Sequence, residues 1–288
     1  MNSKILILGV DSSLGTSIFN SDYFSEFSLY GTTRKKENID KNIFFLDLNQ
    51  DLEEFKLLDL NVSFVVFCAS VTSIDFCEKN SEEAFKINVE SLVDLAKYFS
   101  SKNIKIIFPS TNLVFEGSDF NPGVNSLVTP ISEYAKQKVI VENYLLNNCD
   151  DSAIIRFGKI IFSEMKLFDY WVDELSQKKT IFPFEDMVFS PISEKSALKI
   201  IKDIINNDLK GIFHASSKDD ISYFDAATWI RKKMGLSSKF VEPIKAKKEN
   251  KNILLSKRTA LSECFSDNII YSGIESLNQL KKIQEWIK

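Results

Sequence analysis

The sequence predicts an α/β protein with a doubly wound parallel sheet of the Rossmann type and a smaller C-terminal domain. Three observations favour this class. Short apolar runs alternate with segments of helical periodicity up to about Arg156, as expected for buried parallel strands joined by helices. The first apolar run leads directly into a turn that holds two glycines six residues apart. A length of 288 residues allows one large domain and one smaller one.

The first strand is expected at residues 5–8, and the first helix is expected to begin at about Thr16. Between them lies Gly9-Val10-Asp11-Ser12-Ser13-Leu14-Gly15. Glycine permits a tight turn in which backbone N–H groups approach a pyrophosphate. Ser12 stands where such turns often carry another glycine, so its hydroxyl could donate to a phosphate while its Cβ would crowd the ligand. We predict a dinucleotide-binding turn formed by Gly9, Ser12, Ser13, Leu14 and Gly15.

The second strand is expected at residues 27–30 and runs into Gly31-Thr32-Thr33-Arg34-Lys35-Lys36. An acidic residue at this place binds a ribose hydroxyl of NAD, whereas a basic residue suits the 2′-phosphate of NADP. The planar guanidinium of Arg34 matches phosphate geometry. We therefore predict that Arg34 and Lys35 bind NADP(H) in preference to NAD(H), with a solvated basic turn as the alternative interpretation.

The third and fourth strands are expected at residues 42–48 and 62–67. Asp47 lies near the end of the third strand, where it could meet the adenine. Small residues follow the fourth strand and let a dinucleotide pass over the carboxyl end of the sheet. The predicted cofactor contacts here are Asp47, Leu48, Cys68, Ala69 and Ser70.

The fifth strand, expected at residues 104–108, runs into a turn that contains Thr111, and Tyr134-Ala135-Lys136-Gln137-Lys138 follows. Tyrosine has an ordinary pKa of about 10. A lysine one helical turn further on lies on the same helix face, and its charge favours tyrosinate and lowers that pKa. This arrangement is typical of a carbonyl reductase, and we predict that Thr111, Tyr134 and Lys138 are its catalytic residues.

A helix is expected at residues 81–99, between the fourth and fifth strands. Within it, Asn88 either orients backbone or water behind the site or faces solvent. Tyr98 and Lys102 repeat the Tyr-x-x-x-Lys spacing, but they precede the hydroxyl-bearing turn. Position therefore selects Tyr134 over Tyr98.

These motifs resemble the dTDP-4-dehydrorhamnose reductase branch of the extended short-chain dehydrogenases. The resemblance rests on residues 68–75, Asn88, 110–117 and 134–138, and continues through 153–158, 190–192, 211–216, 221–227 and 254–257. It implies that Thr111 bonds the substrate oxygen, that Tyr134 donates the proton and that Lys138 holds the nicotinamide ribose. It also implies substrate contacts from Thr72, Asn112 and Arg156. Asn112 and Leu113 depart from the Asp and Tyr of that branch, which points to a different substrate choice.

The resemblance implies an NADPH-dependent reductase of a nucleotide-linked 4-keto-6-deoxysugar, in the synthesis of surface polysaccharide sugars. A sugar-nucleotide epimerase that retains NAD is one alternative, and a catalytically silent NAD(P)-binding regulatory subunit is another. Residues 1–157 are expected to form the NAD(P)-binding Rossmann domain. Residues 158–288 are expected to be mainly the substrate-binding domain, with segments around 185–216 returning to the Rossmann sheet.

The net charge, the apolar runs and the cysteine spacing exclude several other classes of protein. A net charge of −4 argues against a nucleic-acid partner. The sequence has no apolar run of about 18 residues, so we expect no membrane span. It enters the first strand with no room for a signal peptide, so we expect a cytoplasmic protein. A homodimer is possible. Cys68, Cys77, Cys149 and Cys264 lack metal-type spacing, so no metal is expected. His214, the only histidine, is interpreted as structural.

Four helices are expected in the second half of the chain from their apolar periodicity. They cover residues 165–177, 194–207, 223–234 and 275–287, and Ser193 is expected to cap the second of them.

Overall fold

The computed structural model describes residues 3–56, 61–117, 121–246, 259–262, 265 and 272–287. The segment 254–257 and Cys264, both used above, lie outside these residues. The chain forms two compact units. The first comprises Met1–Val114, Val128–Arg156 and Leu198–Phe213, and the second comprises Phe115–Leu127, Phe157–Ala197 and His214–Lys288.

A seven-stranded sheet in the order β10-β6-β5-β4-β1-β2-β3 organises the first unit. The pairings of β1 with β2 and β4, of β2 with β3 and of β4 with β5 are parallel. The order reverses between β1 and β4, which is where doubly wound sheets bind dinucleotides. The predicted doubly wound fold is thus confirmed. Its strands are β1 (Lys4–Leu8), β2 (Ser28–Thr33), β3 (Ile43–Phe45), β4 (Phe64–Phe67), β5 (Lys105–Thr111), β6 (Ala153–Phe157) and β10 (Gly211–Ala215).

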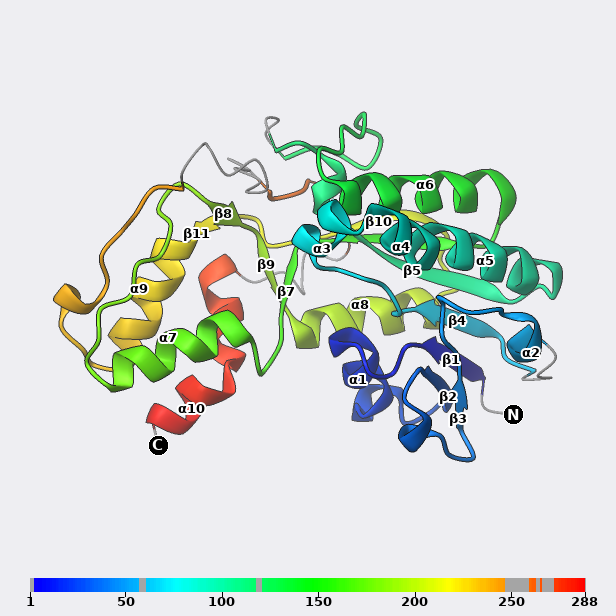
Figure 1. Cartoon of the computed structure of the whole chain (residues 1–288), viewed down its shortest axis with the longest axis horizontal. Coiled ribbons are helices and arrows are strands. Elements are labelled where there is room, and N and C mark those ends of the chain that lie inside the picture. The colour runs from blue at the N-terminus through cyan, green and yellow to red at the C-terminus, as the bar shows by residue number, and fades with distance from the viewer. Residues whose placement is uncertain are drawn as a thin grey trace. The chain divides into compact units, whose positions relative to one another are not determined.

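Helices cover both faces of this sheet. Figure 1 shows α4, α5 and α6 on one face and α1 and α8 on the other. Apolar residues of β1, β4 and β5 meet those of α5 and α6 in one buried cluster, which includes Leu8, Phe67, Phe99, Phe108 and Val141. The helices are α1 (Ser13–Phe19), α2 (Glu53–Lys56), α3 (Ile74–Lys79), α4 (Ser81–Phe85), α5 (Ser91–Ser101), α6 (Glu133–Asn148) and α8 (Glu194–Asn206).

The second unit has its own apolar core, formed by Phe168, Trp171, Phe189, Ile230 and Leu277 among others. Two short two-stranded sheets accompany it, one pairing β7 with β9 in parallel and one pairing β8 with β11 antiparallel. Its elements are β7 (Lys159–Ile161), α7 (Lys166–Ser176), β8 (Val188–Phe189), β9 (Pro191–Ser193), β11 (Ile221–Ser222), α9 (Tyr223–Lys233) and α10 (Lys281–Ile287).

Several element boundaries differ from expectation. Strand β2 continues to Thr33 and β5 continues to Thr111, so each ends on a hydroxyl side chain. The expected closing helix is interrupted, because Leu280 has extended backbone between the 3-10 segment Gly273–Gln279 and α10. The cap of α8 is as predicted, since the Ser193 hydroxyl accepts the N–H of Ser196 at 3.1 Å. Among the helices described, none combines the length and apolarity needed to cross a bilayer.

Candidate active site

Thr111 is the last residue of β5, and a 3-10 turn at Asn112–Val114 follows directly. Its Oγ1 accepts the N–H of Leu113 at 3.2 Å and donates to Oδ1 of Asn112 at 3.5 Å. The second contact is long for a hydrogen bond between oxygens. The hydroxyl proton of Thr111 is therefore weakly held and can be redirected to a ligand.

Tyr134 lies in the first turn of α6, which packs against β5 and against the 3-10 turn. The hydroxyl of Ser132 caps this helix by accepting the N–H of Ala135 at 3.3 Å. The ring packs in an apolar cluster with Cys77, and Leu113 borders the same cluster. Burial raises the pKa of Tyr134 above its ordinary value, so the phenol stays protonated at neutral pH.

Lys138 lies one helical turn after Tyr134, buried at the end of β5. Its Nζ donates to the carbonyl of Pro109 at 3.0 Å and lies 4.5 Å from the centroid of the Phe108 ring. It is 5.8 Å from the centroid of the Tyr134 ring. The pKa of Tyr134 is raised rather than lowered as expected, because burial is the largest influence on that phenol. Burial also lowers the pKa of Lys138 to about 8.

We predict that Lys138→Met raises the free energy of unfolding at pH 7. The lowered pKa of Lys138 means that folding disfavours its ammonium form by roughly 3 kcal/mol. The hydrogen bond to Pro109 returns about 1 kcal/mol, so the expected gain is about 2 kcal/mol. Because the wild-type penalty is complete below pH 8 and disappears as pH approaches the ordinary lysine pKa of 10.5, the gain should shrink across that interval.

Denaturant unfolding of both proteins between pH 6.5 and about pH 10.5 measures this difference. Lys136→Met is the matched control, because Lys136 is exposed and its ion pair within the described residues is with Glu133 at the surface. It removes the same charge and should change stability little. A Lys138→Met protein that is less stable than wild type throughout this range would contradict the expectation.

Asn88 faces the protein interior rather than solvent, which settles the choice that the sequence left open. It lies in a π-helical turn, Lys86–Glu90, between α4 and α5, and is 1% exposed. Its Oδ1 accepts the N–H of Val71 at 2.8 Å and the hydroxyl of Ser70 at 3.0 Å. Its Nδ2 donates to the carbonyl of Val71 at 2.9 Å and to Oε1 of Gln137 at 2.8 Å. Asn88 thus joins the loop after β4 to α6, the helix that carries Tyr134 and Lys138.

The predicted dinucleotide turn follows β1 and depends on both of its glycines. Gly9 has a φ of +86°, and a Cβ there would lie 2.8 Å from Cα of Ala69, in the loop after β4. A Cβ on Gly15 would lie 2.1 Å from the carbonyl oxygen of Gly9. No other residue type fits either place without a backbone shift. The turn and the loop after β4 therefore meet in contact at the switch point of the sheet.

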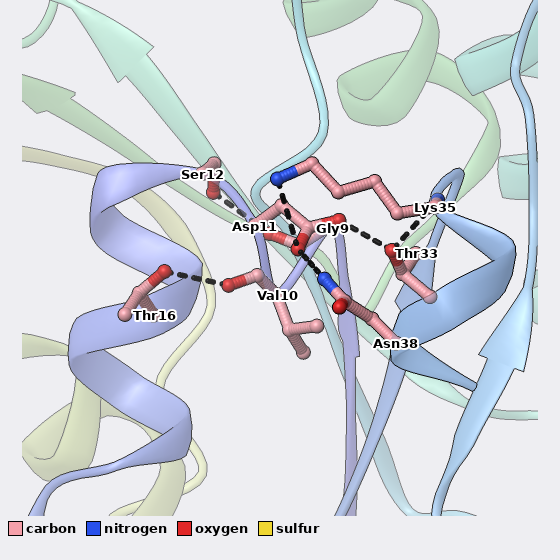
Figure 2. Close-up of polar contacts among 8 residues, drawn as sticks. All are labelled: Gly9, Val10, Asp11, Ser12, Thr16, Thr33, Lys35 and Asn38. Carbon is pink, nitrogen blue, oxygen red and sulfur yellow. Dashed lines mark hydrogen bonds and ion pairs between the residues drawn. The ribbon is translucent and has the colours of Figure 1, made fainter. Parts of the chain in front are cut away.

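Ser12 has a different role from the one expected. Its hydroxyl donates to the carbonyl of Gly9 at 2.8 Å (Figure 2), and it accepts the N–H of Gly15 at 3.0 Å. The hydroxyl has a single proton, and this bond uses it. Ser12 therefore fastens the turn, and a contact from it to a phosphate stays a prediction. Ser13 and Leu14 begin α1, with Ser13 exposed.

The end of β2 holds a polar cluster that the sequence did not reveal. Asp11 accepts a short hydrogen bond from the hydroxyl of Thr33 and another from Nδ2 of Asn38 at 2.9 Å (Figure 2). Nζ of Lys35 lies 3.9 Å from the same carboxylate. Arg34 is exposed, and no hydrogen bond or ion pair engages it within the described residues. The position of Asp11 inside the glycine turn was the available signal, because the loop after β2 approaches that turn in this fold.

The other predicted cofactor contacts lie on the loops that follow β3 and β4. Asp47 accepts the N–H of Asn49 at 3.0 Å, and Leu48 is buried in the core. Cys68 is a free thiol whose pKa burial raises to about 12. Thr72, a predicted substrate contact, is exposed in the loop that precedes α3.

Arg156 requires a correction, because the structure buries the side chain that the sequence predicts to contact substrate. Arg156 is 3% exposed and Glu142 is 2% exposed. Nη2 of Arg156 bonds Oε2 of Glu142 at 2.8 Å, and Nε lies 3.2 Å from both carboxylate oxygens. The hydroxyl of Ser110 donates a short hydrogen bond to the same carboxylate. The guanidinium thus holds β6 to α6 inside the core and presents no surface to a sugar.

The arrangement fits a nicotinamide dinucleotide. The two glycines leave the turn after β1 without side chains where it meets Ala69, and loops from β2, β3 and β4 border the same end of the sheet. Thr111, Tyr134 and Lys138 lie at that end as well, on β5 and α6.

In the part of the chain that is described, no group of three or more side chains is suited to hold a metal ion. His214 is buried, and its Nδ1 lies 3.0 Å from the carbonyl of Ser262, as a structural residue would be.

Comparison with known proteins agrees with this site. The sequence profile of the RmlD substrate binding domain family matches residues 3–277. The chain belongs to this family. The predicted resemblance to the dTDP-4-dehydrorhamnose reductase branch of the extended short-chain dehydrogenases is therefore confirmed.

Three proteins that are similar to this RmlD-family chain differ in their named roles. Methionine adenosyltransferase 2 subunit beta of Danio rerio is 25% identical over 260 residues, which cover 84% of this chain and 77% of the relative. A probable low-salt glycan biosynthesis reductase of Haloferax volcanii is 24% identical over 245 residues, which cover 82% of each. The crystal structure of dTDP-4-dehydrorhamnose reductase from Bacillus anthracis, solved with NADP, has a TM-score of 0.85 at 18% identity and covers 97% of this chain and 99% of that one.

Proposed function

We propose that this chain is an NADPH-dependent reductase of a nucleotide-linked 4-keto-6-deoxysugar, used to make surface polysaccharide sugars. The observation that carries the proposal is the grouping of Thr111, the protonated phenol of Tyr134 and the buried ammonium of Lys138 at the carboxyl end of β5. Membership of the RmlD family and the similarity to a glycan biosynthesis reductase support it. Under this proposal the first unit binds the cofactor and the second contributes substrate contacts. A cytoplasmic location and a homodimer stay predictions.

The cofactor, when bound, supplies a hydride to the carbonyl carbon of the sugar. Tyr134 gives its phenolic proton to the carbonyl oxygen, and its raised pKa keeps that proton in place until it is needed. The weakly held hydroxyl of Thr111 donates to the same oxygen and steadies the developing charge. The ammonium of Lys138, near the Tyr134 ring, stabilises the phenolate that remains. Asn88 holds the helix that carries both residues.

A regulatory subunit without turnover is the second candidate. It is favoured by the similarity to methionine adenosyltransferase 2 subunit beta over 84% of the chain. The Ser12 hydroxyl, which is used within the turn, and the carboxylate of Asp11 beside it also depart from an open phosphate-binding turn. The presence of Thr111, Tyr134 and Lys138 weighs against this candidate.

Oxidation of NADPH, followed with a panel of dTDP-, GDP- and UDP-linked 4-keto-6-deoxysugars, tests the proposal. We expect turnover with at least one sugar and a hydroxyl at C4 of the product. Binding of cofactor without turnover on any of these sugars would favour the regulatory subunit. Mass spectrometry of the purified protein separates the third alternative, because tightly retained NAD would indicate an epimerase.

A further inference from the structure

A carboxylate occupies the place where the first and second strands present their ends to the adenosine half of a dinucleotide. Asp11 follows β1 within the glycine turn and is bonded by the hydroxyl of Thr33, the last residue of β2. The same hydroxyl of Thr33 accepts the N–H of Lys35 at 3.0 Å, and Asn38 donates to the other oxygen of Asp11 at 2.9 Å. Figure 2 shows these side chains converging between the turn and the end of β2.

This location bears on cofactor choice for a topological reason. In doubly wound sheets, the residues at the end of the second strand are those that contact the adenosine ribose and distinguish its 2′-hydroxyl from a 2′-phosphate. Asp11 is tied to three residues of this segment, Thr33, Lys35 and Asn38. A negative charge therefore lies within the region where the sequence alone predicts only the positive charges of Arg34 and Lys35.

We infer that Asp11 determines the balance between NADPH and NADH by opposing the 2′-phosphate. The inference rests on the proposed function, because it concerns the cofactor of the same site. Asp11 acts in two ways. Its charge repels a phosphate dianion, and it partly neutralises Lys35, whose Nζ lies 3.9 Å from the carboxylate. A carboxylate can also accept a hydrogen bond from the ribose hydroxyl of NADH.

The cluster is held firmly enough for this role. Thr33 is 2% exposed, so the hydroxyl that holds Asp11 is fixed by the packing of β2. The turn that carries Asp11 is fixed as well, since Oγ1 of Thr16 donates to the carbonyl of Val10 at 2.7 Å. The carboxylate therefore cannot swing away from an approaching phosphate without breaking its bonds to Thr33 and Asn38. Arg34 is exposed, and within the described residues no hydrogen bond or ion pair engages it, so its guanidinium can pair with the phosphate.

Direct binding of NADPH and NADH to wild type and to Asp11→Asn tests the inference, with fluorescence of the reduced nicotinamide as the readout and no substrate present. Asparagine keeps the shape of the side chain and removes its charge. We expect the variant to bind NADPH about tenfold more tightly and NADH no more tightly than wild type does. Asp22→Asn is the matched control, because it removes one exposed carboxylate that has no part in the cluster. It should leave both affinities unchanged.

The ionic-strength dependence of NADPH binding, compared between wild type and Asp11→Asn, gives a second readout. Salt screens both the repulsion by Asp11 and the attraction by Arg34, so removal of Asp11 should steepen the loss of NADPH affinity with salt. Equal changes in the affinities for NADPH and NADH in Asp11→Asn, or no change in either, would overturn the inference while leaving the proposed reductase intact. Failure of wild type to bind either cofactor would overturn both.

Discussion

Replacing Tyr134 with phenylalanine is expected to lower the rate of carbonyl reduction by a factor on the order of 10²–10⁴. The substitution removes only the phenolic oxygen, and the ring stays in the apolar cluster with Cys77 and Ala84. Binding of NADPH and thermal stability should therefore be close to those of wild type. Single-turnover measurement of NADPH oxidation at saturating ketosugar, together with cofactor titration, separates loss of the proton from loss of binding.

Tyr98→Phe is the control for this substitution, because Tyr98 and Lys102 have the same spacing in sequence. Nζ of Lys102 lies 5.2 Å from the centroid of the Tyr98 ring at the end of α5, so the pair also resembles the catalytic pair in geometry. Tyr98 nevertheless packs against Phe99 on the helix that precedes β5. Its variant should retain nearly full activity. Activity that survives in Tyr134→Phe and disappears in Tyr98→Phe would show that the site is misplaced.

The second large effect is expected from Arg156→Met, which should lower the free energy of unfolding by about 3–5 kcal/mol. The substitution leaves the carboxylate of Glu142 buried, and among the described residues the hydroxyl of Ser110 still bonds it. For a chain of this length the loss corresponds to a decrease in Tm of roughly 10 °C. Thermal and denaturant unfolding measure it directly. Well below the Tm, the KM for the ketosugar should be unchanged, because Arg156 lies in the core.

Two further variants test whether the loss of stability comes from the buried, unpaired charge of Glu142. Arg156→Met combined with Glu142→Leu removes both charges and should recover most of the lost stability, since apolar side chains of similar size often replace a buried ion pair without cost. Lys202→Met breaks the more exposed pair with Glu26 and should cost far less stability. A stable Arg156→Met protein with a strongly increased KM would instead restore Arg156 to the substrate site.

The sequence predicts the fold well, and it also predicts the elements that carry Thr111, Tyr134 and Lys138, because both depend on local patterns. The apolar run that becomes β1, the glycines at 9 and 15, and the Tyr134–Lys138 spacing are each contained within a few residues. Their interpretation needs only the geometry of a strand, a turn and a helix. The break at Leu280 was missed because helical periodicity continues across it, and the carbonyl of Ser163, which bonds the N–H of Lys281 at 2.8 Å, is far away in sequence.

The polar clusters could not be predicted, because their members meet only through the tertiary fold. Asp11 is 22 residues from Thr33 and 27 residues from Asn38. Arg156 on β6 and Glu142 on α6 are 14 residues apart, and neither position shows by itself that the other neutralises it. The family resemblance therefore implied a ligand contact for Arg156, whereas the fold supplies it with a buried partner. Likewise, burial of Tyr134 depends on Cys77 and Ala84, which belong to other helices.

The amide of Asn88 joins the loop after β4 to α6, two segments that are far apart in the sequence. It bonds both backbone groups of Val71 and the side chain of Gln137, so the loop after β4 cannot shift while α6 stays still. A ligand that displaces this loop must act on the helix that carries Tyr134 and Lys138. Ala69 of the same loop lies against Gly9, so the glycine turn, the loop after β4 and the helix that carries Tyr134 and Lys138 form one continuous chain of contacts.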